Sequence, residues 1–155
     1  MTALESLTLV VRRTVRAAPE RLFAAWTDPA HLLRWWGPAH VRCAGAEVDL
    51  RIGGVWRIGN QLPNGAVLWI VGTFERIEPP HCLVYTWRLE PGPDTQERVT
   101  IRFEPRGADT EVIIVHERIA DEAVRADHEM GWLGCLDGLV AWLENGTSRV
   151  PAPAS

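Results

Sequence analysis

The pattern of hydrophobic and polar positions divides the chain into several short stretches with strand-like alternation and one long helical stretch near its end. The helical stretch runs from Asp121 to Asn145 and makes about seven turns. At about 100° per residue, one stripe of this helix holds Trp132, Leu133, Leu136, Leu139, Val140 and Leu143. An apolar stripe needs a surface to pack on, so we expect this helix to cover a sheet.

The first two turns of this helix interrupt the apolar stripe. Arg125 and Glu129 lie on the axis of the stripe, and His128 and Cys135 lie at its edge. Two interpretations are open at this point. This half of the helix faces a partly wet cavity, or Arg125 and Glu129 only reach past the end of the sheet into solvent.

Period-two alternation and β-branched residues predict seven strands before this helix. Their expected ranges are 4–16, 41–51, 55–60, 66–77, 82–89, 97–104 and 110–118. Two short helices are expected after the first strand, because Pro19 and Pro29 suit first helical turns and Asp28 can cap the second.

Short connections between the strands favour an antiparallel sheet. We therefore predict an α+β fold. In this fold a curved seven-stranded antiparallel sheet carries two short helices after its first strand, and the long C-terminal helix covers its concave face. We expect residues 1–148 to form a single domain and residues 149–155 to form a flexible tail.

Composition narrows the function classes without choosing one. The chain has 155 residues, of which 46% are hydrophobic and 23% charged, as in an ordinary globular domain. The net charge of −4 is spread along the chain, which argues against a nucleic acid partner. We expect no membrane span and a cytoplasmic location, because no apolar run nears the roughly 20 residues that a span needs and no signal pattern is present.

Eight tryptophans accompany only one tyrosine and three phenylalanines. Indoles suit cavity walls because they combine a large apolar area with one N–H group, but they also suit a packed core. The residues expected to line a cavity between sheet and helix are Trp35, Trp36, His40, Trp56, Trp69, Tyr85, Trp87, His116, His128, Trp132 and Cys135. Among them, Trp69, Tyr85, Trp87 and His116 are expected to point at the helix, and Trp35, Trp36 and His40 are expected to form the lip of the cavity. The alternative is that these side chains fill the space completely.

Catalytic candidates are few. His116 and Glu117 are neighbours on a strand and must face opposite sides, but His116 could pair with His128 or Glu129 across the gap for acid–base work. Tyr85 is a further candidate. The histidine spacing fits no metal motif, the three cysteines are far apart, and no glycine-rich phosphate loop is present, so we expect no metal and no cofactor.

Several segments in a fixed order resemble a known family. They are 16–29 (RAAPERLFAAWTDP), 35–38 (WWGP), 49–57 (DLRIGGVWR), 72–77 (GTFERI), 79–80 (PP), 83–87 (LVYTW), 116–117 (HE), His128 and 131–132 (GW). The chain resembles bacterial single-domain members of the family named for homologues of the activator of the heat-shock-protein-90 ATPase. That family lies in the START and birch-pollen-allergen (SRPBCC) superfamily. The resemblance implies the helix-grip fold with a cavity between sheet and helix.

Three functions are compatible with these observations. The first is binding of a small hydrophobic or aromatic molecule in the cavity. The second is a cofactor-free lyase, cyclase, hydrolase or isomerase step on a hydrophobic substrate in the same cavity. The third is a protein-interaction or stress-response module related to chaperone-ATPase activators, acting through an exposed surface such as Trp35-Trp36. An exposed edge strand would also permit a homodimer.

Overall fold

The computed structural model describes residues 6–37, 41–92 and 96–146. Its elements follow in the order β1 (Leu7–Val15), α1 (Pro19–Thr27), α2 (Pro29–Trp35), β2 (Arg42–Val48), β3 (Val55–Gln61), β4 (Val67–Glu78), β5 (Cys82–Glu90), β6 (Glu97–Arg106), β7 (Asp109–Ile119) and α3 (Glu122–Asn145). The predicted α+β fold is confirmed in its number, type and order of elements. The tail predicted at 149–155 lies outside the described residues.

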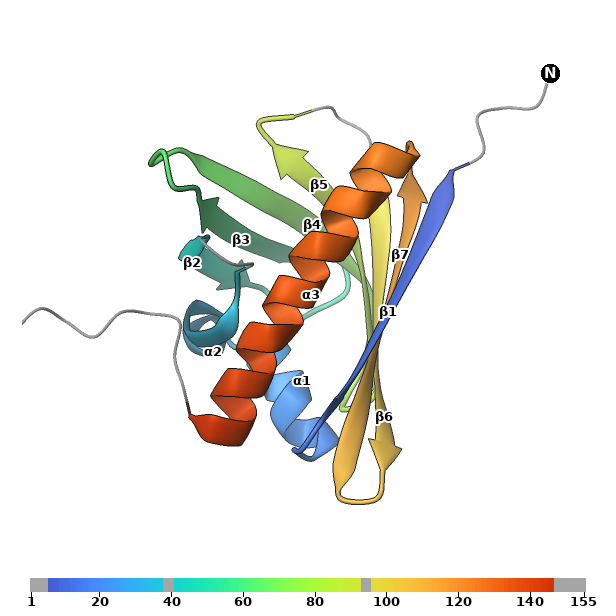
Figure 1. The fold of residues 1–155 in the computed structure, drawn as a ribbon. Coiled ribbons are helices and arrows are strands. Elements are labelled where there is room, and N and C mark those ends of the chain that lie inside the picture. Colours follow the sequence, from blue (N-terminus) through green and yellow to red (C-terminus); the bar gives the residue numbers. More distant parts are fainter. Residues whose placement is uncertain (1–5, 38–40, 93–95, 147–155) are drawn as a thin grey trace, which may run out of the picture.

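All strand pairs are antiparallel, and the sheet order is β1-β7-β6-β5-β4-β3-β2. β1 and β2 are therefore the two edges of the sheet. The sheet curls, and α3 runs diagonally across its hollow side while α1 and α2 lie near the C-terminal half of α3 (Figure 1). No helix in the described part of the chain combines the length and the apolar character needed to cross a membrane.

The helix starts and stops follow local sequence signals. The Asp28 carboxylate accepts a hydrogen bond from the backbone N–H of Ala30, and the Asp121 carboxylate accepts one from that of Val124. Such caps satisfy N–H groups that the first turn leaves unpaired. α3 ends at Asn145 and is followed by Gly146, whose positive φ of 69° forms a left-handed cap that glycine adopts without strain.

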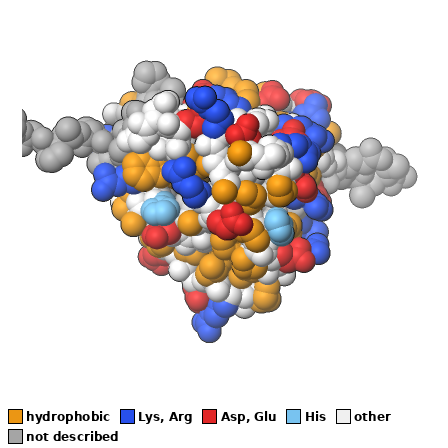
Figure 2. Space-filling model, turned by 90° about the horizontal axis from the view of Figure 1, so that it is seen from below, with side chains coloured by type: hydrophobic (Ala, Val, Ile, Leu, Met, Phe, Trp, Pro, Cys, Tyr) orange, Lys and Arg blue, Asp and Glu red, His pale blue; other side chains and the backbone are white. Residues whose placement is uncertain are grey.

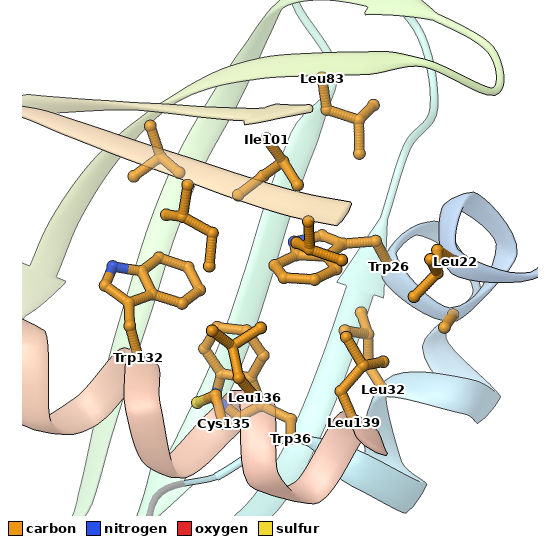
Figure 3. Close-up of a cluster of buried hydrophobic side chains, with 14 of the residues drawn as sticks. Leu22, Trp26, Leu32, Trp36, Leu83, Ile101, Trp132, Cys135, Leu136 and Leu139 are labelled. Atoms are coloured by element: carbon orange, nitrogen blue, oxygen red, sulfur yellow. The ribbon is translucent and has the colours of Figure 1, made fainter. Parts of the chain in front are cut away.

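The C-terminal half of α3 seals a packed core. Leu136 and Leu139 are fully buried, and Figure 3 shows them facing α2 and the sheet side chains Leu83 and Ile101. Burying each such side chain contributes about 1.5–3 kcal/mol relative to exposing it. Leu133 departs from the predicted stripe and is 46% exposed, because it sits at the margin of the contact with the sheet.

The second strand is shorter than predicted. It ends at Val48, and the chain then turns between Asp49 and Gly54, with backbone hydrogen bonds from Arg51 N–H to the Asp49 carbonyl and from Gly54 N–H to the Arg51 carbonyl. A Cβ at Gly54 would lie 2.1 Å from the Asp49 carbonyl oxygen, so the turn can close only on glycine. The prediction of a strand to residue 51 was wrong because this tight turn takes its last three residues.

Candidate functional site

A cavity of about 370 Å³ lies between the N-terminal half of α3 and strands β3 to β5. Its lining residues are Trp36, Asn60, Leu68, Ile70, Trp87, Leu89, Val124, Asp127, His128, Gly131, Trp132 and Cys135. The wall is mostly apolar and carries a small number of polar groups. This volume and this lining are typical of a site for a small organic molecule. The aromatic side chains therefore do not fill the space completely.

The structure brings part of the predicted lining together. Trp36, Trp87, His128, Trp132 and Cys135 line the cavity as expected. The indole N–H of Trp36 donates to the Asn60 side-chain oxygen over 2.9 Å and so ties the end of α2 to β3. His40 lies outside the described residues.

Three of the predicted lining residues belong to the packed core. Trp35, Trp56 and Tyr85 are fully buried and do not line the cavity. The Trp56 and Tyr85 rings stack at 4.7 Å, and the Tyr85 hydroxyl accepts a hydrogen bond from the Trp26 indole N–H. Burial raises the pKa of Tyr85, which keeps the hydroxyl protonated. Tyr85 thus lies in the core behind the cavity rather than at its surface.

Trp69 was expected to point at the helix, and this expectation was wrong. It pairs with Gly59 across β3 and β4 on the outer face of the sheet, where the Arg57 guanidinium lies 3.7 Å from the centre of its ring. A Cβ at Gly59 would lie 2.8 Å from the same ring. β4 is apolar on both faces, and a cation–π contact covers the outer one.

The polar start of the helical stripe also lies away from the cavity. The Arg125 guanidinium contacts the Glu122 carboxylate and the Thr8 carbonyl beside β1, and Glu129 is exposed. The pairing of His116 with Glu129 is therefore not formed. Each interpretation holds for one flank of this half of the helix. Arg125 and Glu129 reach the solvent beside the sheet edge, whereas Val124, His128 and Gly131 face the cavity.

A carboxylate between two imidazoles adjoins the cavity wall. One oxygen of Glu97, Oε1, lies 2.6 Å from His116 Nε2 and 2.8 Å from His128 Nε2. The two imidazole rings stack at 4.5 Å, and Trp87 packs edge-on against both. The Trp132 indole N–H donates to His116 Nδ1 over 3.0 Å. We call Glu97, His116, His128 and Trp132 the His–Glu–His cluster.

The donor and acceptor roles in this cluster follow from chemistry. Burial by itself would raise the pKa of the Glu97 carboxyl, but the hydrogen bonds and charges of His116 and His128 outweigh it and lower the pKa to about 2. Glu97 is therefore an ionised acceptor, and each facing Nε2 carries a proton. The indole of Trp132 can only donate, so His116 Nδ1 carries no proton.

His116 is thus held as a neutral imidazole. Burial lowers the pKa of His116, and the hydrogen bond to Glu97 offsets this only in part. A proton added at Nδ1 would also place two N–H donors against each other at the Trp132 contact. His116 is completely buried. It fixes the position of Glu97, while His128 is the member of the pair that lines the cavity.

Comparison with known proteins agrees with this architecture. Residues 16–144 match the family described as Activator of Hsp90 ATPase homolog 1-like protein. The chain belongs to this family. No match was found among curated proteins.

Solved structures similar to this family member come from several organisms. Protein CV1439 from Chromobacterium violaceum is 28% identical, with a TM-score of 0.81 over 88% of this chain and 96% of that chain. The AHSA1 protein SPO3351 from Silicibacter pomeroyi is 29% identical, with a TM-score of 0.78 over 89% and 98%. PFC0360w, an HSP90 activator from Plasmodium falciparum, is 24% identical with a TM-score of 0.69 over 90% and 96%, which shows the shared fold alone.

On the face shown in Figure 2, neither acidic nor basic side chains form a broad patch. Acidic, basic and hydrophobic side chains intermingle there. The tryptophan pair once expected on the surface is not exposed, since Trp35 is fully buried and Trp36 is 3% exposed. An interaction surface built on that pair is therefore excluded, because Trp35 packs against Trp26 of α1 and Trp36 packs against β3 and α3.

The His–Glu–His cluster also has the composition of a metal site. The ligand atoms of Glu97, His116 and His128 lie within 4.8 Å of one another. A neutral imidazole that binds metal through Nε2 carries its proton on Nδ1 and donates it to a second group. Here the Trp132 indole N–H already occupies His116 Nδ1 as a donor. The residues present therefore fit a hydrogen-bonded cluster better than a metal centre.

Sequence reasoning missed several residues of the site. Glu97 was the main omission, although a signal existed. Glu97 lies two and four residues before Val99 and Ile101, which face inward from β6. Because alternate residues of a strand share a face, the Glu97 carboxylate could be expected to point into the fold. Asn60 and Asp127 were also missed, and no pattern in the sequence singles out either residue.

Proposed function

We propose that this protein binds a small hydrophobic or aromatic molecule in the cavity between α3 and strands β3 to β5. The observation that carries the proposal is the cavity itself, about 370 Å³ of space within a wall of mostly apolar side chains. Sites for small molecules have this size and lining, with a few polar groups that orient the guest. Membership of a family whose fold places a cavity beneath the last helix supports the proposal.

The experiment is a titration with N-phenyl-1-naphthylamine, a neutral dye that brightens in apolar surroundings. Trp36, Trp87 and Trp132 line the cavity, so dye bound there should also quench tryptophan emission. Gly131→Leu is the test variant, because a Cβ at Gly131 meets no other atom within 4 Å and the added side chain would enter open space. We expect this variant to weaken dye binding at least tenfold.

The matched control is Ala123→Leu, which adds a leucine to an exposed position of the same helix that is not among the residues lining the cavity. It should bind the dye as the parent protein does. If the parent takes up no dye, or if Gly131→Leu binds it as tightly as the parent, the proposal is wrong.

A cofactor-free enzyme is the second candidate function, and the contact between His128 and Glu97 favours it. A carboxylate that holds one imidazole nitrogen orients the other as a general base. The probe is 5-nitrobenzisoxazole. A base removes its ring C–H proton, the C–H electron pair forms the nitrile, the N–O bond breaks, and a coloured phenolate is released. Turnover by the parent protein that is lost in His128→Phe would support the enzyme. If the parent protein releases phenolate no faster than buffer alone does, general-base action on this probe is excluded.

An interaction with a chaperone has less support than either function. Trp35 and Trp36, which were expected to form its exposed contact surface, are both buried.

A further inference from the structure

The polar groups of the cavity differ in whether they already have partners. His128 Nε2 is engaged by Glu97, and the Asn60 side-chain oxygen is engaged by the Trp36 indole. No described group hydrogen-bonds to His128 Nδ1. Only two side-chain nitrogens among the described residues are both fully enclosed and unpaired, His31 Nδ1 and Trp87 Nε1. His128 Nδ1 is not one of them, so open space reaches it.

This open space is the cavity, because His128 is one of its lining residues and its side chain is only 11% exposed. The state of Nδ1 follows from the opposite nitrogen. Since Glu97 is an acceptor, Nε2 carries the proton, and in the neutral imidazole Nδ1 then presents a lone pair. The hydrogen bond to the Glu97 carboxylate fixes this tautomer and the orientation of the ring. The cavity therefore offers a hydrogen-bond acceptor at a fixed place in an apolar wall.

We propose that His128 Nδ1 recognises a hydroxyl donor on the bound molecule, so that the ligand is an aromatic or apolar compound with an acidic hydroxyl group, a phenol or an enol. This inference rests on the proposed function, since it names the ligand class of the same cavity. His116 and Trp132 contribute indirectly by holding Glu97, and through it the tautomer of His128.

Geometry supports a hydroxyl rather than a carbonyl at this position. A carbonyl oxygen can only accept, and it would meet the lone pair of Nδ1 without a proton between them. A buried acceptor left without a partner costs binding free energy, whereas a hydroxyl donor satisfies it. The charged and titratable groups around His128 include Glu97 and His116, which contact it, and Asp127 and Cys135, which line the same cavity. The Asp127 carboxylate is the rival acceptor that an experiment must separate from His128.

The test compares two ligands of nearly equal shape, 2-naphthol and 2-methoxynaphthalene, by isothermal titration calorimetry at about pH 8, above the pKa of a free imidazole. The methyl ether keeps the apolar rings and removes the donor. We expect the parent protein to bind 2-naphthol about tenfold more tightly, as one hydrogen bond to a polarised acceptor provides. In His128→Phe the two affinities should agree within about twofold, and in Asp127→Ala, which removes the rival acceptor, the tenfold preference should remain.

Each outcome separates this inference from the proposed function. If both ligands bind the parent protein equally well, cavity binding stands and recognition by His128 is wrong. If neither binds, both proposals fail. If Asp127→Ala removes the preference and His128→Phe keeps it, Asp127 is the acceptor and the inference is overturned. The ligand pair measures the preference in the parent protein directly, and the Asp127 variant tests the rival acceptor without removing a member of the His–Glu–His cluster.

Discussion

Replacement of Gly131 by alanine provides a stability test of the open cavity. Gly131 lies within α3, and a Cβ built there meets no other atom within 4 Å. Glycine inside a helix costs about 1 kcal/mol relative to alanine, because it loses more backbone entropy on folding. If the space is open, no overpacking opposes this gain. We therefore expect Gly131→Ala to raise the free energy of unfolding by about 1 kcal/mol and Tm by about 2–4 °C.

The assay is equilibrium unfolding in urea, followed by tryptophan fluorescence and by circular dichroism. Gly72→Ala is the contrasting variant. A Cβ at Gly72 would lie 1.9 Å from the Thr86 carbonyl oxygen, so the backbone of β4 or β5 must move. Overpacking of this kind costs about 1–3 kcal/mol or more.

Two results would refute the reasoning. If Gly131→Ala lowers the free energy of unfolding, the methyl group meets atoms and the cavity is closed in solution. If Gly131→Ala and Gly72→Ala shift stability alike, the contacts at these two positions do not control it. If the slope of unfolding free energy against urea concentration is the same in all three proteins, the variants expose as much surface on unfolding as the parent does.

Three further predictions concern pH and single contacts. Stability should fall as pH drops below 6.5, because the unfolded chain then protonates His116 while the folded chain resists, and again between 4.5 and about 2 as Glu97 protonates. Urea midpoints measured against pH would show both declines, and Glu97→Gln should remove the second. Asp121→Ala should cost about 1 kcal/mol in urea unfolding by removing the α3 cap. Thr110→Val should cost about 1–3 kcal/mol in thermal unfolding, since it leaves the Ala17 carbonyl, now 2.7 Å from the hydroxyl, without its buried donor.

Local signals account for most of the fold that the sequence predicted. Strand alternation, the prolines at helix starts and the aspartate caps each act within a few residues, so they can be recognised without the fold. The face of β4 could not be predicted in this way. Trp69 and Ile70 are both apolar, and only the pairing of Trp69 with Gly59 and the Arg57 contact identifies its outer face.

The site was predicted less completely because it lies off the axis of the helical stripe. Val124, His128 and Gly131 lie on a flank roughly 80–140° from Leu136, whereas Arg125 on the axis faces β1. A helix that crosses a curled sheet presents different flanks at its two ends, and periodicity alone cannot show the crossing. The encounter of His116 with His128 is one of two pairings that the sequence left open, and the carboxylate between them comes from a third element, β6.

The shared oxygen of Glu97 has a consequence for how this protein can change over evolutionary time. The oxygen belongs to β6 and accepts hydrogen bonds from His116 of β7 and His128 of α3, and the Trp132 indole, also on α3, donates to His116. Replacement of any one member by an apolar residue leaves a polar atom of a neighbouring member without a hydrogen-bond partner beneath the helix. Lineages should therefore retain the quartet intact or exchange it for apolar residues together. Among distant relatives, positions 97, 116, 128 and 132 should covary as one inherited unit.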